Sequence, residues 1–363
     1  MEQPLITAII PTYKRPHWLK RAVRSFLSQT FPDFIVLIAD NSSGPETDCA
    51  VQQLMKQDRR VKLLQHPTNI GLTATLQMAL MHTTTPYVCF LPDDDFVGPS
   101  FFEETLPKFK EYPNIALSGG GGLLINEKFE TKKITANKQT IPVSGFYPAP
   151  QGLFAYLHSS YGIGFSGCLF KTECAKEVGG FDQRIRIGVD IDLVAKCAAK
   201  FPVYFLTDRP FYFAFQHGGS LSLTRNAASD EKEVGYLHEN IGALLSHQTE
   251  KHALEAFYKK REYKILSYGY NDFCKAKNFG EARLCAEKLC LLTHSFRWKR
   301  KKVEASLFAL LLLFYRCISS VKTLEKKLRT LGRKRRNTHI NTSHIPEDAA
   351  RWKEYALSLE KNE

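Results

Sequence analysis

The sequence lacks the features that mark a disulfide framework, a zinc site or a membrane span. Its nine cysteines are scattered and none forms a C-x-x-C pair, so we predict reduced structural thiols. In the most basic part of the chain, the longest uncharged run is 305–315, well short of the roughly 18–20 residues that a spanning helix needs. A strand-like run begins at Leu5, which leaves no room for a signal peptide, and we expect a cytoplasmic protein.

Positive charge is concentrated in one segment. The chain carries a formal net charge of +13, and residues 297–336 hold fourteen Lys or Arg against Glu304 and Glu325, which is +12. With its uncharged centre, this segment is typical of a helix lying in an anionic membrane interface, so we expect peripheral attachment to the inner face of the cell membrane. A core helix with solvated basic ends is the alternative. The segment has no recognisable nucleic-acid module, and no nucleic-acid partner is expected.

The first 115 residues alternate between strand-like and helix-like patterns. This alternation predicts an α/β fold, a Rossmann-like and mostly parallel sheet flanked by helices on both faces. The expected strands are 5–10, 34–39, 61–64 and 87–91. The expected helices are 17–28, 46–56, 72–82 and 101–112.

The rest of the chain divides by composition. One domain is expected over 1–225, with a regular half, 1–115, and a half rich in strands and glycine, 116–225. A helical extension, 226–295, a basic amphipathic segment, 296–336, and a C-terminal tail, 337–363, follow it. The four-glycine run 119–122 lacks the Lys-Ser/Thr of a phosphate-binding loop, so we interpret it as a turn or a place of close packing.

Three consecutive carboxylates, Asp93, Asp94 and Asp95, directly follow the apolar run 87–92. A run of that length reads as a buried strand, so the acids stand where a parallel sheet meets its ligands. Adjacent carboxylates repel one another unless a cation shares them, and Mg²⁺ or Mn²⁺ prefers such oxygen ligands together with phosphates. A solvated acidic turn that caps the next helix is the alternative, but the position after a buried strand favours a metal site.

Five short motifs occur in the order and spacing of one known family. They are P-T-Y-K-R, A-D-N-S-S, N-x-G, F-L-P-D-D-D, and G-G-F-D ahead of D-I-D-L. Over residues 4–222 the chain resembles a family 2 glycosyltransferase with a GT-A fold, of the type that makes bacterial cell-surface polysaccharide, lipopolysaccharide or capsule. The resemblance implies metal-dependent transfer of a sugar from a nucleotide-diphosphate sugar to a hydroxyl of a glycan or lipid-linked acceptor, with inversion. It also implies that 1–115 binds the nucleotide and 116–225 the acceptor.

The resemblance assigns donor contacts to the ends of the first three expected strands. Asp40 would accept a hydrogen bond from a pyrimidine imide, with UDP the favoured nucleotide, and Arg15 could reach phosphate. Asn69 and Gly71 match a turn that lets the backbone approach the nucleoside. A plain turn is the alternative for these polar motifs. The full set of implied donor contacts at these ends is Pro11, Thr12, Tyr13, Arg15, Asp40, Asn69 and Gly71.

The metal ligands implied by the resemblance are Asp93, Asp95 and His217. The two acids match a D-x-D pattern, but Pro92 replaces the acid that most often comes first. Asp94 and Asp95 therefore stay alternatives for the main ligand, and we favour Asp95. His217 lies in an H-x-G-x-x-S stretch and could ligate the metal or donate to phosphate, with an ordinary surface histidine as the alternative.

The acceptor base is implied at Asp190, with Asp192 in reserve. The family's E-D pair aligns on Val189-Asp190, so this chain keeps only the second acid. Acids in a first helical turn also serve as dipole complements, which leaves a structural role open. The missing Glu keeps a non-catalytic nucleotide-sugar-binding or scaffold protein of the same fold as the alternative function. A nucleotidylyltransferase is disfavoured because no Gly-rich basic loop follows the first strand.

Overall fold

The computed structural model describes residues 4–42, 44–126, 143–158, 163–218, 227–275, 284–289, 354–355 and 357–360. Contacts between residues divide the chain into two compact units. Unit 1 contains Met1–Thr224, Glu239–Lys251 and Thr342–Glu363, and unit 2 contains Arg225–His238 and His252–Asn341. Within the expected C-terminal tail, 337–363, the described residues 354–355 and 357–360 belong to unit 1.

Unit 1 is built on a mixed, mostly parallel sheet, as the alternating pattern predicted. Within the described residues the strand order is β3-β2-β1-β4-β8-β6-β10-β5, and β9 pairs with β6 and β7. β1 runs parallel to both β2 and β4, whereas β8 is antiparallel to β4 and β6. The strands are β1 (Ile6–Thr12), β2 (Phe34–Asp40), β3 (Val61–Gln65), β4 (Tyr87–Phe90), β5 (Phe96–Val97), β6 (Leu117–Asn126), β7 (Gly145–Tyr147), β8 (Ile163–Lys171), β9 (Val203–Leu206) and β10 (Tyr212–Gln216).

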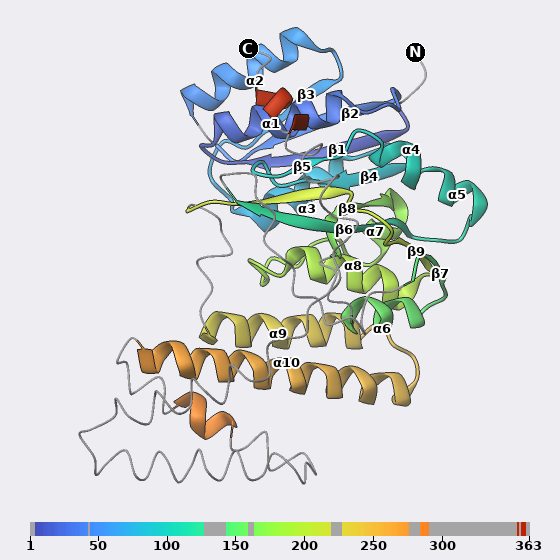
Figure 1. Cartoon of the computed structure of the whole chain (residues 1–363), viewed down its shortest axis with the longest axis vertical. Coiled ribbons are helices and arrows are strands. Elements are labelled where there is room, and N and C mark those ends of the chain that lie inside the picture. The colour runs from blue at the N-terminus through green and yellow to red at the C-terminus, as the bar shows by residue number, and fades with distance from the viewer. Residues whose placement is uncertain are drawn as a thin grey trace. The chain divides into compact units, whose positions relative to one another are not determined.

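Helices flank this sheet, with α1 and α2 on one side and α8 on the other (Figure 1). The expected helix 101–112 is divided in two, because Pro107 has no N–H and its ring crowds the carbonyl four residues earlier. The helices are α1 (Pro16–Leu27), α2 (Pro45–Gln57), α3 (Leu72–His82), α4 (Phe101–Thr105), α5 (Pro107–Glu111), α6 (Gln151–His158), α7 (Thr172–Glu177), α8 (Val189–Lys200), α9 (Ala227–Gly242) and α10 (Gln248–Lys275).

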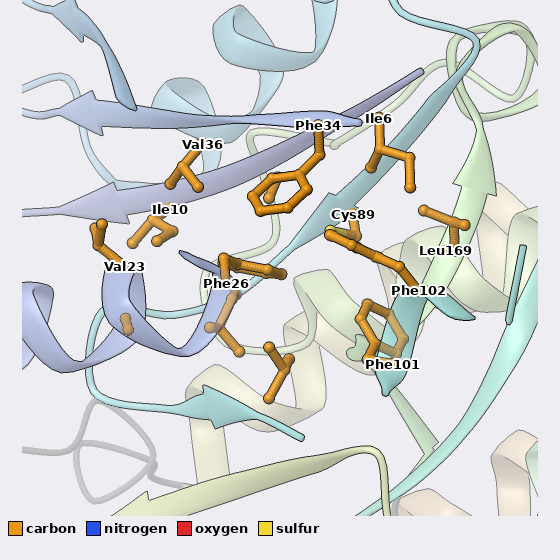
Figure 2. Packing of buried hydrophobic residues seen from close by; sticks show 14 of the residues in the cluster. Ile6, Ile10, Val23, Phe26, Phe34, Val36, Cys89, Phe101, Phe102 and Leu169 are labelled. Carbon is orange, nitrogen blue, oxygen red and sulfur yellow. The ribbon is translucent and has the colours of Figure 1, made fainter. Parts of the chain in front are cut away.

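The main core lies between the first strands of the sheet and helices α1, α2 and α4. Figure 2 shows Phe26 of α1, Phe34 of β2 and Phe102 of α4 packed together. The Phe102 ring centroid lies 5.7 Å from that of Phe26 and 5.3 Å from that of Phe34. Each buried side chain of this size contributes about 1.5–3 kcal/mol, so this layer holds β1, β2 and β4 in register.

The four-glycine run is a strand, and it marks close packing rather than a turn. Gly119, Gly120 and Gly122 lie in β6 against the neighbouring strands. A Cβ on Gly122 would lie only 2.5 Å from the ring of Tyr212, its register partner on β10. The missing side chains therefore make room for an aromatic ring.

None of the helices within the described ranges is long and apolar enough to cross a membrane. The basic segment 296–336, predicted to lie on a membrane surface, falls outside the residues that the structure describes.

Candidate functional site

The carboxyl ends of β1, β2 and β4 meet at one edge of the sheet. β1 and β2 end side by side, with Thr12 opposite Asp40 in the parallel register. Backbone hydrogen bonds between neighbouring segments continue just past the strand ends. The Asn41 N–H donates to the Thr12 carbonyl at 3.0 Å, and the His66 N–H donates to the Asp40 carbonyl at 2.9 Å. The sequence motifs after these strands therefore occupy one place in the fold, as a parallel sheet requires.

Five of the predicted residues gather there into what we call the acidic cluster: Thr12, Arg15, Asp93, Asp94 and His217. Thr12 Oγ1 donates to Asp93 Oδ2 at 2.8 Å. Arg15 Nη1 lies 3.4 Å from Asp93 Oδ1 and 3.1 Å from Asp94 Oδ2. His217 Nε2 lies 3.0 Å from the same Asp94 oxygen. Asp94 Oδ2 is thus the point on which a guanidinium and an imidazole converge.

The three consecutive acids have different surroundings. Asp93 is buried, and burial together with the neighbouring Asp94 carboxylate raises the pKa of Asp93 to about 7. Asp95 has a backbone partner instead, since its Oδ1 accepts a hydrogen bond from the Phe215 N–H at 3.0 Å. Burial also raises the pKa of Asp95 well above its usual range. Asp95 therefore ties the turn after β4 to β10.

A divalent cation would find a partial ligand set in this cluster. The described residues hold no group of three or more His, Cys, Asp and Glu arranged for a metal ion. Asp94 Oδ2 and His217 Nε2, 3.0 Å apart, do offer one carboxylate oxygen and one imidazole nitrogen close together. Mg²⁺ and Mn²⁺ sites that act on nucleotides usually take one or two protein carboxylates and complete their shell with phosphate oxygens and water. The chemistry of these donors fits such an ion.

Two residues of α1, Trp18 and Arg21, complete the surroundings of His217, and sequence reasoning missed both. The Trp18 ring stacks on the His217 ring with centroids 5.1 Å apart. The Arg21 guanidinium lies over the Trp18 and Phe215 rings, 4.7 and 4.2 Å from their centroids, and Nη2 donates to the Asp94 carbonyl at 2.5 Å. Their spacing of three residues places them on one face of a helix, but it does not show that this face meets His217.

A second set of polar residues lies at the ends of β2 and β3. Asn69 Oδ1 accepts hydrogen bonds from Asn41 Nδ2 at 2.9 Å and from the Gly71 N–H at 3.0 Å. A hydrogen bond with Asn69 also lowers the pKa of the exposed Tyr13. Gly71 has a φ of 85°, a value that favours glycine, and nothing within 4 Å would meet a Cβ there. The structure therefore contains the predicted N-x-G turn, and the space beside Gly71 is open. Asn41 also supports this turn, although the sequence did not single it out.

Asp40 and Pro11 are more enclosed than the neighbouring turns. Pro11 is buried within β1, and Asp40 is 1% exposed at the end of β2. Gln65 Nε2 donates to Asp40 Oδ2 at 3.1 Å. Recognition of a pyrimidine by Asp40 stays a prediction.

The two acids proposed for the acceptor side, Asp190 and Asp192, lie in the first turn of α8 and differ sharply in burial and contacts. Asp190 is half-buried, and a Cβ placed on Gly164 of β8 would lie 3.3 Å from Asp190 Oδ2 and 3.0 Å from Tyr212 Oη. The carboxylate and the phenol therefore reach the same small space, and Tyr212 is a further residue that sequence reasoning missed.

Asp192, by contrast, is held in a buried ion pair. It is 1% exposed, and Oδ2 lies 2.7 Å from Lys196 Nζ one turn later in α8. Asn240 Nδ2 donates to Asp192 Oδ1 at 3.0 Å, and Lys196 Nζ donates to the Gly180 carbonyl at 2.6 Å. Both charges are therefore neutralised inside the protein, and this geometry favours Asp190 over Asp192 as an acid that meets ligands.

Comparison with known protein families gives a match to the N-terminal part of this chain. The model described as "Glycosyl transferase family 2" matches residues 7–166. An uncharacterised glycosyltransferase of Haemophilus influenzae is 27% identical over 139 residues, 38% of this chain and 56% of that protein. The GalNAc(5)-diNAcBac-PP-undecaprenol beta-1,3-glucosyltransferase of Campylobacter jejuni is 32% identical over 93 residues, 25% of this chain and 30% of that protein. The chain thus spans little more than half of the first relative and under a third of the second.

Solved structures share the architecture over a longer stretch. Residues 1–349 of TarS from S. aureus match with a TM-score of 0.60 and 15% identity, covering 79% of this chain and 80% of that chain. The same part of TarS in complex with UDP-GlcNAc matches with a TM-score of 0.57, over 79% of this chain and 81% of that chain. At this level of identity the likeness concerns the fold, which agrees with the GT-A fold implied by the motifs.

Proposed function

We propose that this chain, a member of glycosyl transferase family 2 over residues 7–166, transfers a sugar from a nucleotide-diphosphate sugar to a hydroxyl of a bacterial cell-surface glycan or its lipid-linked precursor. The observation that carries the proposal is the acidic cluster at the carboxyl edge of the sheet, where Arg15 and His217 converge on Asp94. The names of the relatives, which include a glucosyltransferase acting on an undecaprenol-linked glycan, support this acceptor class. The UDP-GlcNAc complex of TarS supports a UDP-sugar donor.

In this proposal the acidic cluster holds the diphosphate of the donor. Asp94 and His217 would hold Mg²⁺ or Mn²⁺, which when bound neutralises the charge that develops on the departing nucleoside diphosphate. Arg15 supplies a fixed cation on the same side. Asp93 and Asp95 would support the turn, Asp93 through Thr12 and Asp95 through the Phe215 N–H. The base would lie against Tyr13, Asp40 and the turn that contains Asn69 and Gly71.

On the acceptor side, Asp190 is proposed as the general base. Its carboxylate would take the proton of the acceptor hydroxyl as that oxygen bonds to the anomeric carbon and the nucleoside diphosphate leaves with the bonding electrons. Its half-buried position at the start of α8, beside Gly164 and Tyr212, supports this role. Attack from the face opposite the leaving group inverts the anomeric carbon.

Ligand-dependent thermal unfolding tests the donor site. UDP, GDP, CDP and dTDP are added with and without Mn²⁺, since a ligand at 100 times its Kd adds about 2.7 kcal/mol to the native state. We expect UDP with Mn²⁺ to raise the Tm of the wild type and of Asp33→Asn, an exposed acid before β2 that serves as the matched control. Asp94→Asn should lose the Mn²⁺-dependent part of the rise. An equal rise in Tm in Asp94→Asn would show that the acidic cluster is not part of the donor site.

Turnover separates an enzyme from a binding protein of the same fold. Release of UDP from UDP-GlcNAc and other UDP-sugars is measured for the wild type and for Asp190→Asn, with and without a membrane extract as the source of acceptor. Loss of a general base usually costs about 10²–10⁴-fold in rate, and nucleotide binding should stay unchanged. Equal rates of UDP release, with equal binding, would favour the non-catalytic alternative.

We also propose that the basic segment 297–336 places the enzyme on an anionic membrane surface, near a lipid-linked acceptor. The proposal rests on the charge of +12 in these residues. Replacing Arg333, Lys334, Arg335 and Arg336 by Gln in the full chain should reduce co-sedimentation with vesicles that contain phosphatidylglycerol, while UDP binding stays unchanged. Undiminished co-sedimentation of this variant would argue against membrane attachment through the basic segment.

A further inference from the structure

A short described segment near the end of the sequence lies on the α/β domain, next to the acidic cluster. Residues 354–355 and 357–360, which we call the C-terminal segment, are helical and belong to unit 1. They are drawn in red beside α1 in Figure 1. Leu359 is 5% exposed and lies in a buried cluster with Phe96, Phe213 and Phe215. A segment far from the site in sequence thus shares a small core with β5 and β10.

Polar contacts fix the segment in one position. Tyr355 Oη lies 2.7 Å from Ser28 Oγ and donates to the Val97 carbonyl at 3.2 Å. Arg24 Nη1 donates to the Leu359 carbonyl at 2.9 Å. The contacts engage α1 and β5, so the apolar cluster and the hydrogen bonds together define a single register for the segment.

Arg21 connects this segment to the acidic cluster. It is 2% exposed, and burial lowers its pKa, with the Glu360 carboxylate as the largest opposing influence. Arg21 Nη1 lies 3.5 Å from Glu360 Oε1, and Nη2 donates to the Asp94 carbonyl. A buried cation requires acids to compensate it, and Glu360 of the C-terminal segment contributes more to this than Asp95 or Asp94. One guanidinium thus touches the end of the chain and the backbone of the turn after β4.

We propose that the C-terminal segment is a positioning element of the donor site, in which Leu359 and Glu360 hold Arg21 and Arg21 holds the turn that carries Asp94. The inference rests on the proposed function for its effect on donor binding. Its structural part, the hold on the turn, does not depend on any ligand. Arg21, Leu359 and Glu360 act through Asp94 and are positioning residues rather than catalytic ones.

The consequence for the site follows from the contacts of the turn. Asp94 Oδ2 must meet Arg15 and His217, and its carbonyl is tied to Arg21. If Glu360 loses its charge, the buried guanidinium keeps only the weaker compensation from Asp95 and Asp94, and its hold on the Asp94 carbonyl becomes less defined. The turn then samples positions in which the carboxylate no longer meets the imidazole. Donor affinity falls, whereas the acceptor base at Asp190 stays in place.

The test compares two variants of the full chain with a control on the same segment. Glu360→Gln removes the charge that faces Arg21, and Leu359→Asp expels the segment from its apolar cluster. Glu354→Gln makes the same chemical change as the first variant at an exposed position six residues earlier. Tm is measured for all three, and Glu360→Gln keeps the experiment informative if Leu359→Asp fails to fold.

The first readout is amide hydrogen exchange in residues 92–97 and 213–217 without ligand. We expect exchange to accelerate at least about fivefold in Glu360→Gln and more in Leu359→Asp, a size typical of coupling between distant sites, and to match the wild type in Glu354→Gln. Unchanged exchange of the turn in a folded Glu360→Gln protein would overturn the proposal, because the segment would then only cover an apolar surface.

The second readout is the Kd for UDP in the presence of Mn²⁺. An increase of at least about fivefold in Glu360→Gln, partly restored in Glu360→Asp, is expected, with no change in Glu354→Gln. If wild type binds no nucleotide, the proposed function fails, and the hydrogen-exchange result still decides whether the segment positions the turn. Faster exchange with an unchanged Kd for UDP would overturn the link to the donor site.

Discussion

The Nε2 atom of His217 lies 3.0 Å from Oδ2 of Asp94, although 123 residues separate them in the sequence. The pair forms because Asp95 accepts the Phe215 N–H, which joins the turn after β4 to the strand that ends just before His217. Trp18 stacks on the imidazole and limits its orientation. The Asp94 carboxylate and the His217 imidazole are thereby held against each other, next to the Arg15 guanidinium.

Replacing His217 by Ala should weaken nucleotide binding only when a divalent cation is present. The imidazole is one of two protein donors in the proposed ion site, and we expect the Kd for UDP with Mn²⁺ to rise at least about tenfold. Isothermal titration calorimetry with and without EDTA measures this change. His82→Ala, on the exposed face of α3, is the matched control and should bind as the wild type does. An equal loss of UDP affinity in EDTA would assign His217 to the phosphate instead of the ion.

Gly164→Ala should slow transfer without weakening donor binding. The added Cβ would meet Tyr212 Oη at 3.0 Å and Asp190 Oδ2 at 3.3 Å, so the proposed base must move by a few tenths of an ångström. Because a misplacement of about 1 Å can cost about 100-fold in rate, we expect kcat to fall about tenfold. Gly235→Ala in α9, where nothing within 4 Å would meet the Cβ, is the control and should leave kcat unchanged. A normal kcat in Gly164→Ala would show that this space is not used by the acceptor.

Lys196→Met should destabilise the fold strongly, because it leaves the Asp192 carboxylate buried without its cation. Removal of one partner of a buried pair costs about 3–5 kcal/mol of the free energy of unfolding, measured by urea denaturation. Lys200→Met removes an exposed pair with Glu177 at 2.9 Å in the same helix and should cost under about 1 kcal/mol.

The double variant Asp192→Leu with Lys196→Met should recover most of that stability, since an apolar pair can replace a buried ion pair. It should also keep UDP release from the donor. Loss of turnover in a stable double variant would return Asp192 to the list of acids that take part in the reaction.

Acid stability should depend on Asp182. Hydrogen bonds from Arg184, with Nη2 2.7 Å from Oδ2, lower the pKa of Asp182 to about 2, below the value of about 3.9 expected in the unfolded chain. A folded pKa below the unfolded one gives stability that is present above about pH 4 and is lost as the pH falls towards 2. Urea midpoints between about pH 2 and 6 should therefore fall less steeply on acidification in Asp182→Asn than in the wild type. Arg184→Gln should show the same weaker dependence, and a wild-type profile in both variants would contradict the assignment.

Much of the fold and of the site could be predicted from local sequence patterns. The alternating strand and helix patterns predicted β1 to β4 and α1 to α3 nearly at their observed bounds. The reason is that the spacing of hydrophobic residues differs between a helix and a strand and shows which face of each is buried. The helix expected at 101–112 was the exception, since Pro107 divides it. Strand ends of a parallel sheet share one edge, and the structure places Thr12, Arg15 and Asp94 together there.

What local patterns missed are contacts made by side chains from distant segments. Arg21 reads as an ordinary polar residue of an amphipathic helix, yet it is buried against Phe215 and bonded to the Asp94 carbonyl. Tyr212 reads as a strand residue, and only the glycines of β6 and β8 give its ring a place to lie. Neither hydrophobic periodicity nor a motif indicates which residues Arg21 and Tyr212 contact.

By itself, the sequence determined that polar and acidic motifs follow a series of parallel strands, because hydrophobic periodicity and turn residues act over a few neighbours. Only the tertiary structure decided how the three acids after β4 divide their contacts: Asp93 meets Thr12, Asp94 meets His217 and Asp95 meets β10. It also decided that Asp192 is neutralised by Lys196, and that Glu360 lies against Arg21. The direction of a carboxylate in a turn depends on donors that reach it from elsewhere in the fold, and those donors come together only when the chain is packed.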